Sequence, residues 1–234
     1  MENKTQVKTV ERVDEGLRVY MSKVYNYMAG GLIVTAMAAY FTVYTPLFNL
    51  FFTPEGLSVF GWIILFAPLV MAFAFASVLT KGSTNAVKGF FWAFSAVMGM
   101  SLAPILLAYT GTSVTRIFLI TAAMFGGMSI YGYTTKKDLT SMGSFLIMGL
   151  WGIIIASVVN IFLGSTGLSF IVSILAVGIF VGLTAYDTQK IRDIYAENDN
   201  EDLMTRKVVS GAVSIYLDFI NLFLALLRLF GDRR

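Results

Sequence analysis

Two aspartates stand where an otherwise apolar chain is expected to cross a membrane. In the stretch TAYDTQKI, Asp187 ends a long apolar run, and Asp218 follows 31 positions later inside the apolar run SIYLDFINLF. Two neighbouring carboxylates in a medium of low dielectric constant cannot both ionise easily, so such a pair tends to share a proton. Once both groups are deprotonated, the same oxygens attract a hard cation such as calcium.

Composition indicates the class of protein that must position these two carboxylates. Of the 234 residues, 57% are hydrophobic and 13% are charged, whereas an ordinary soluble domain has about 25% charged residues. We therefore expect an all-α integral membrane protein whose constant partner is membrane lipid. The net charge of +3 lies mostly in connections and tails, where it bears on membrane orientation and does not indicate nucleic-acid binding.

Cysteine and histidine are both absent from the chain. Their absence excludes thiol nucleophiles, disulfides, the usual zinc sites and any Ser-His catalytic pair. We therefore predict that the protein is not an enzyme and has no cofactor apart from weakly bound calcium. An intramembrane hydrolase using the two aspartates stays open as an alternative, but no substrate motif supports it. Carboxylates are also left as the groups that could sense pH.

Apolar runs divide the chain into one short tail and one transmembrane domain. Residues 1–23 alternate acids and bases, which predicts a cytosolic N-terminal tail, and residues 24–234 form the single domain. A spanning helix needs about 20 mostly apolar residues. Seven stretches meet or approach this requirement: Met28–Thr45, Leu57–Leu79, Gly89–Tyr109, Ile117–Tyr133, Gly143–Leu163, Leu168–Tyr186 and Val208–Leu227.

The distribution of Lys and Arg predicts the orientation of these spans. Both residues are frequent in the N-terminal tail and in the even-numbered connections, and they are absent from the first and fifth connections. This pattern places the N-terminus in the cytoplasm. Seven full spans would leave the C-terminus outside with Arg228, Arg233 and Arg234. A re-entrant last segment, with six spans, is the alternative, but the last run is long enough to span.

Asp218 is the one Asp, Glu, Lys or Arg residue inside the predicted spans. A carboxylate near the middle of a bilayer costs about 2.5–3.5 kcal/mol, so it is expected to face the bundle interior and to have a partner. At a rise of about 1.5 Å per residue, Asp218 lies about 15 Å from Val208, and Asp187 lies about 28 Å from Leu168. One helix must tilt, or water must reach inward, for the two carboxylates to meet.

Helical periodicity places a polar stripe on the last span. Ser214, Asp218, Asn221 and Ala225 share one face, which favours the lining of a pathway. A purely structural alternative is a protonated Asp218 that bonds to a neighbouring backbone or to Asn160.

Three further features could support the pair. Lys81 and Arg228 are candidate cationic gate partners, with snorkelling toward lipid headgroups as the alternative for each. Asn221 is a candidate polar partner. The four-residue spacing of Gly178 and Gly182 predicts close helix packing.

The two aspartate stretches, TAYDTQKI and SIYLDFINLFLALLRLFG, together with YGYTTKKDL, resemble the Bax inhibitor-1 family, also called the transmembrane Bax inhibitor motif family. The set of segments is similar to that of a bacterial inner-membrane member. The resemblance implies a seven-helix fold in which the first six helices wrap a central last helix. It also implies that Asp187 and Asp218 form a hydrogen-bonded pair that senses pH and gates a calcium leak, with Lys81 able to pair with Asp187.

The resemblance also implies an arginine latch that this chain does not fully reproduce. In some members the arginine matching Arg228 pairs with an acid in the second helix, but no acid occurs here between Leu57 and Thr80. The main hypothesis is therefore a pH-sensitive calcium or cation leak, in which Asp187 and Asp218 form the gate and bind calcium weakly. The alternative is a non-transporting regulator that restrains a membrane-bound protease through its tail or connections.

Overall fold

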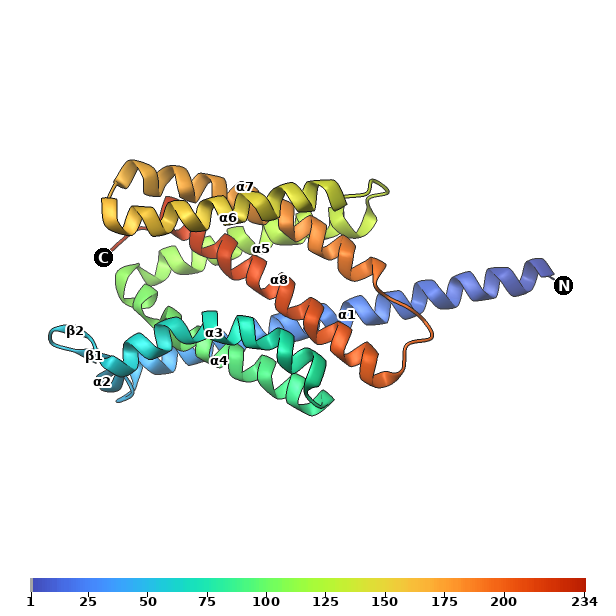
Figure 1. Cartoon of the computed structure of the whole chain (residues 1–234), viewed down its shortest axis with the longest axis horizontal. Helices are drawn as coiled ribbons and strands as arrows, with labels where there is room; N and C mark the ends of the chain where they lie inside the picture. Colours follow the sequence, from blue (N-terminus) through green and yellow to red (C-terminus); the bar gives the residue numbers. More distant parts are fainter. Residues whose placement is uncertain (1) are drawn as a thin grey trace. The chain divides into compact units, whose positions relative to one another are not determined.

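A computed structural model describes the backbone from Glu2 to Arg234 and the side chains from Glu15 onward (Figure 1). The side chains of residues 1–14, which belong to the predicted cytosolic tail, lie outside the described residues. The helices are α1 (Glu2–Tyr44), α2 (Phe48–Phe51), α3 (Val59–Lys81), α4 (Thr84–Ala108), α5 (Gly111–Thr134), α6 (Thr140–Leu163), α7 (Thr166–Asp193) and α8 (Glu201–Phe230). A two-stranded antiparallel hairpin, β1 (Phe52–Thr53) and β2 (Gly56–Leu57), precedes α3.

Seven of these helices are long and apolar enough to cross a membrane, which confirms the predicted all-α architecture. They comprise the Glu15–Tyr44 part of α1 and all of α3 to α8. Most extend past the predicted spans because polar residues at the membrane boundary continue the helix. The predicted tail and first span belong to one continuous helix, because α1 runs without a break from Glu2 to Tyr44.

The last segment is one uninterrupted helix. α8 covers 30 residues, or about 45 Å at 1.5 Å per residue, whereas the hydrocarbon core of a bilayer is about 30 Å thick. The re-entrant alternative is therefore wrong. In α8 61% of the residues in the apolar window are buried, against 39% or fewer in each other span. The prediction that six helices surround it stays a prediction.

The connection from α1 to α3 was not predicted to contain a hairpin. α1 ends at Tyr44, just before Pro46, because a proline disfavours helical geometry in the residue that precedes it. The hairpin turn that follows uses Gly56, whose φ of 132° is accessible to glycine at little cost.

The chain divides into two compact units. Unit one comprises residues 1–107 and 191–213. Within it, a Cβ on Gly99 of α4 would lie 2.2 Å from the Thr35 carbonyl oxygen of α1, so glycine is required for this close helix contact. Phe75 of α3 and Phe90 of α4 also lie in contact, with ring centroids 5.9 Å apart.

The first turns of α8 hold the α3–α4 connection within unit one. Arg206 donates one hydrogen bond to the Leu79 carbonyl at 2.5 Å and another to the Gly82 carbonyl at 2.6 Å. Asp202 accepts a hydrogen bond from Thr84 Oγ1 at 2.8 Å. A cation therefore meets the carboxyl end of α3 and an anion meets the amino end of α4, as the helix dipoles favour.

Unit two comprises residues 108–190 and 214–234, and it contains both aspartates. Helices α5 and α7 touch where a Cβ on Gly132 would lie 2.2 Å from the Ala185 carbonyl oxygen. Helices α5 and α8 meet through Phe125 and Phe219, whose ring centroids are 5.5 Å apart. Helices α6 and α7 pack through Gly143, at which a Cβ would lie 2.4 Å from the Tyr186 ring.

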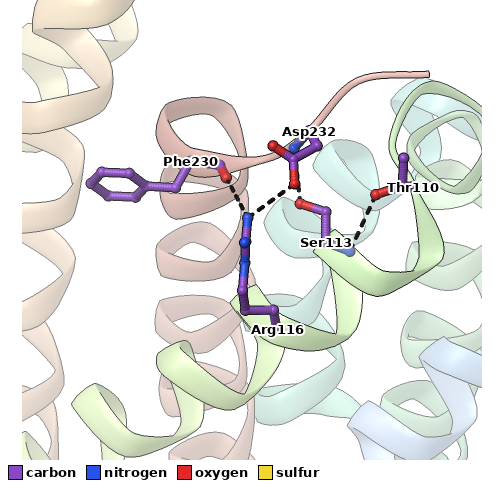
Figure 2. A network of polar contacts seen from close by, with 5 residues as sticks. All are labelled: Thr110, Ser113, Arg116, Phe230 and Asp232. Carbon is purple, nitrogen blue, oxygen red and sulfur yellow. Dashed lines mark hydrogen bonds and ion pairs between the residues drawn. The ribbon is translucent and has the colours of Figure 1, made fainter.

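The C-terminus is tied to the start of α5 (Figure 2). Arg116 donates to the Phe230 carbonyl at 3.2 Å and to the Asp232 carboxylate at 3.1 Å. The Asp232 amide donates to Ser113 Oγ at 2.9 Å, and its carbonyl accepts from the Thr110 amide at 3.0 Å. The chain therefore ends beside the third connection, which the Lys and Arg distribution predicts to lie outside.

Candidate functional site

Helices α7 and α8 bring the two predicted aspartates together inside unit two. Asp187 lies near the end of α7 and Asp218 lies in the second half of α8. Their carboxyl groups lie close enough to act on each other. Asp218 is buried, with 5% of the residue exposed, and Asp187 is partly buried. The site is therefore a pair of carboxyl groups, with the deeper one removed from solvent.

Ser214 connects α8 to the more exposed member of the pair. Its hydroxyl donates to Asp187 Oδ2 at 2.5 Å, which is short for a hydrogen bond and suits a charged acceptor. Ser214 lies one turn before Asp218, so the shared face predicted for α8 meets α7 at this point. Asp187 thus has a fixed donor in addition to its contact with Asp218.

Asp218 has a different environment. Its Oδ2 atom is buried and has no hydrogen-bond partner among the described side chains and backbone groups. Ionised carboxylates accept hydrogen bonds but do not donate them. A hydrogen bond between the two carboxyl groups therefore requires a proton on one of them, and the arrangement suits a pair that holds one proton.

The charges around the pair are few. Lys190, which follows Asp187 by three residues on α7, acts electrostatically on Asp187 together with Asp218. Its Nζ atom lies 5.9 Å from the centre of the Tyr186 ring. Among residues 15–234 no group of three or more His, Cys, Asp or Glu side chains could hold a metal ion. Two carboxylates supply at most four of the six to eight oxygens that calcium takes, so calcium at this pair would take the rest from water or backbone carbonyls.

The predicted cationic partners lie at the surface. Lys81, the last residue of α3, and Arg228 in the last turn of α8 are both exposed. The ion pairs found in the part of the chain with described side chains are Arg116–Asp232, Arg192–Asp193 and Lys207–Asp199. Neither Lys81 nor Arg228 belongs to one, as expected for side chains that extend toward lipid headgroups.

The cation that binds the end of α3 is Arg206, which sequence reasoning did not select. Its two carbonyl acceptors precede it by more than 120 positions, so no local spacing identifies them. The available signal was the i, i+4 pair of Asp202 and Arg206 in the first turns of an otherwise apolar helix, which places both side chains on one face.

The two asparagines considered as partners of the pair make their hydrogen bonds elsewhere. Asn221 donates one amide hydrogen to the Leu217 carbonyl of its own helix at 2.8 Å, and among the described residues no hydrogen bond joins it to either aspartate. Asn160 accepts a hydrogen bond from the Ser165 amide at 3.1 Å and closes the α6–α7 turn. The structural alternative in which Asn160 satisfies Asp218 is therefore not supported by the observed bonds.

The two glycines predicted to pack helices differ. A Cβ on Gly182 would lie 2.6 Å from Leu146 Cδ1 of α6, so a small residue lets α6 and α7 approach. A Cβ on Gly178 would meet no atom within 4 Å among its described surroundings. The four-residue spacing puts both glycines on one face of α7, but α6 approaches closely only at Gly182.

Gln189 is a second polar side chain that sequence reasoning missed. It is 5% exposed and lies two residues beyond Asp187. Its side-chain oxygen accepts from the Leu139 amide at 2.8 Å, and its side-chain nitrogen donates to the Lys137 carbonyl at 2.8 Å. The signal in the sequence was an uncharged amide two positions after the carboxylate in TAYDTQKI.

The sequence from residue 17 to residue 234 matches the family model described as inhibitor of apoptosis-promoting Bax1. The chain belongs to the Bax inhibitor-1 family. This match covers all seven spans except the first two residues of the first one. Membership of the family and the seven apolar helices together establish a multi-span membrane protein, and they confirm the resemblance drawn from the two aspartate stretches.

Relatives in several bacteria are similar over nearly their whole length. The chain is 48% identical over 222 residues to an uncharacterized protein, RP147, of Rickettsia prowazekii, covering 94% of this chain and 92% of that protein. It is 42% identical over 222 residues to the inner membrane protein YbhL of Escherichia coli K12, covering 94% of each chain. An uncharacterized protein of Borreliella burgdorferi is 46% identical over 217 residues and 92% of each chain.

Proposed function

We propose that this Bax inhibitor-1 family protein is a pH-sensitive cation leak, with calcium as a permeant ion, and that Asp187 and Asp218 form its gate. The observation that carries the proposal is the meeting of two carboxyl groups on α7 and α8, one of them 5% exposed, inside helices that are apolar enough to span a membrane. The inner membrane is the proposed location, because the relative YbhL is named an inner membrane protein. The N-terminus is proposed to be cytoplasmic.

The gate works through one proton. With a proton present, the two carboxyl groups share a hydrogen bond, and α7 and α8 are held together at this level. Loss of the proton leaves two negative charges, which repel each other by about 4 kcal/mol at a separation of 4 Å and an effective dielectric constant of 20. The helices then separate locally, and the free oxygens attract a cation. Flux should therefore rise as pH rises.

The test is calcium flux into vesicles that contain the purified protein, measured at pH values on either side of neutrality. Wild-type flux should change by at most about tenfold per pH unit, as a single proton allows. Asp218→Asn should remove this dependence, because an amide cannot exchange the proton. Asp193→Asn is the matched control, since Asp193 is an exposed carboxylate on the same α7 helix. It should keep the wild-type profile.

Two results would contradict the proposal. One is flux with the same pH profile in wild type and in Asp218→Asn. The other is no flux above that of protein-free vesicles at any pH. The second result, together with unchanged partner binding by a variant that carries asparagine at both positions, would favour the non-transporting regulator of a membrane-bound protease.

A further inference from the structure

Gln189 holds α7 from a direction different from that of the aspartate pair. Side chains two residues apart on a helix do not face the same side, so Asp187 faces α8 while Gln189 reaches the connection between α5 and α6. That connection runs from Thr135 to Leu139. Gln189 accepts from its Leu139 amide and donates to its Lys137 carbonyl, each at 2.8 Å.

The two bonds require a side chain that both accepts and donates in a fixed geometry. A primary amide offers one carbonyl oxygen and two N–H donors in one plane. Leu139 and Gln189 are each 5% exposed, so water does not readily replace the bond between them. A buried backbone group that loses its partner retains the full cost of its desolvation. The contact is therefore a rigid anchor for the end of α7.

We propose that Gln189 is a positioning residue for the aspartate pair. Its two hydrogen bonds to the α5–α6 connection fix the rotation of α7 about its axis and so hold Asp187 against Ser214 and Asp218. The effect of Gln189 on flux rests on the proposed function. Its effect on the position of Asp187 does not, because that position can be tested without a transport assay.

The charged and titratable groups around Asp187 do not supply this anchor. Asp218 on α8 and Lys190 on α7 act on Asp187 electrostatically, and Lys190 is exposed. This turn of α7 contacts α6 through Tyr186, against Gly143, and contacts α5 through Ala185, against Gly132. Thr188 Oγ1 also donates to Ser129 Oγ of α5, at a long 3.5 Å. The glycine contacts limit the distance between helices and the long bond is a single point, whereas Gln189 is bonded at two points, each at 2.8 Å, and so restricts rotation more strongly.

The structural test uses the absence of cysteine from the chain. A variant with Asp187→Cys and Ser214→Cys carries two thiols at positions whose native side chains are hydrogen-bonded. Oxidation should join them in a measurable fraction of molecules, although the cysteine side chain is one atom shorter than that of aspartate. Adding Gln189→Met removes both anchor bonds at similar side-chain size and should lower this yield several-fold. Adding Asn160→Leu instead breaks the bond that closes the α6–α7 turn, at the other end of α7, and should leave the yield unchanged.

Hydrogen exchange tests the anchor itself. The Leu139 amide should exchange at least about tenfold faster in Gln189→Met than in wild type, because its acceptor is gone. Gln189→Glu provides a second test of the anchor if the methionine variant does not fold. Glutamate keeps the acceptor and regains a donor when protonated, so its Tm deficit relative to wild type should narrow as pH falls.

The expected set of results is faster Leu139 exchange, lower disulfide yield and, in vesicles, a flatter pH profile of flux for Gln189→Met. The positioning role would be overturned if Gln189→Met left the disulfide yield of the double-cysteine variant unchanged, or if it left the exchange rate of the Leu139 amide unchanged. If wild type shows no pH-dependent flux, the proposed function falls, and the disulfide yield alone still decides whether Gln189 positions Asp187.

Discussion

Gly132→Ala tests how closely α5 approaches α7 beside the aspartate pair. The added Cβ would lie 2.2 Å from the Ala185 carbonyl oxygen and 2.9 Å from the Ala185 carbonyl carbon. These are backbone atoms, which cannot rotate away as a side chain could. Ordinary contact requires the two helices to separate by roughly 1 Å or more. Ala185 lies two residues before Asp187, so this separation would also disturb the pair.

The magnitude follows from a matched comparison on the same helix. A Cβ on Gly127 of α5 would meet no atom within 4 Å among the described residues. Both replacements gain about 0.8–1.0 kcal/mol from the higher helix propensity of alanine. Gly132→Ala alone also incurs the cost of overpacking, about 1–3 kcal/mol. The difference in unfolding free energy between the two variants should therefore be about 1–3 kcal/mol, with Gly132→Ala the less stable.

The assay is thermal unfolding of both variants in the same detergent, followed by circular dichroism. For a chain of this size each kcal/mol corresponds to about 2–4 °C in Tm, so the two variants should differ by at least about 2 °C. Equal Tm values would show that α5 and α7 do not touch at Gly132 and would refute the close approach on which the positions of α7 and Asp187 depend.

Three smaller predictions concern the connections. Arg206→Gln should lower the unfolding free energy by about 1–2 kcal/mol in a denaturation assay, because hydrogen bonds from a charged donor to carbonyls are lost. Arg116→Gln should cost under about 1 kcal/mol in the same assay, since the ion pair with Asp232 is exposed at 54% and 67%. Hydrogen bonds from the Thr140 side chain and backbone lower the pKa of Asp138. Thr140→Val should raise that pKa in an NMR titration, and the small stabilisation from Asp138 should be present at neutral pH and lost as pH falls through its folded-state pKa.

The seven spans and the aspartate pair could be predicted from the sequence for the same physical reason. In lipid every backbone polar group must be satisfied within the chain, so long apolar runs become helices. A carboxylate inside such a run is rare and expensive, so residue type and position alone single out Asp218. The length of the last run favours a full span over a re-entrant piece, and the continuous α8 bears this out.

The contacts that position the pair could not be predicted, because they join residues far apart in sequence. Gln189 meets Leu139 across 50 positions, and Arg206 meets Leu79 across 127. Both bind backbone carbonyls or amides, which every residue carries, so residue type gives no signal of the partner. Gly182 shows the same limit, because its packing depends on where Leu146 of α6 lies.

The central claim is that Asp187 and Asp218 share one proton whose loss opens the gate. Infrared difference spectroscopy of the protein in lipid measures this directly, since a protonated carboxyl group has its own C=O stretching band. The account predicts that this band grows as pH falls through the range in which flux falls, that Asp218→Asn abolishes it, and that Asp193→Asn leaves it intact. A band that persists in Asp218→Asn, or pH-dependent flux with no such band in wild type, would contradict the account.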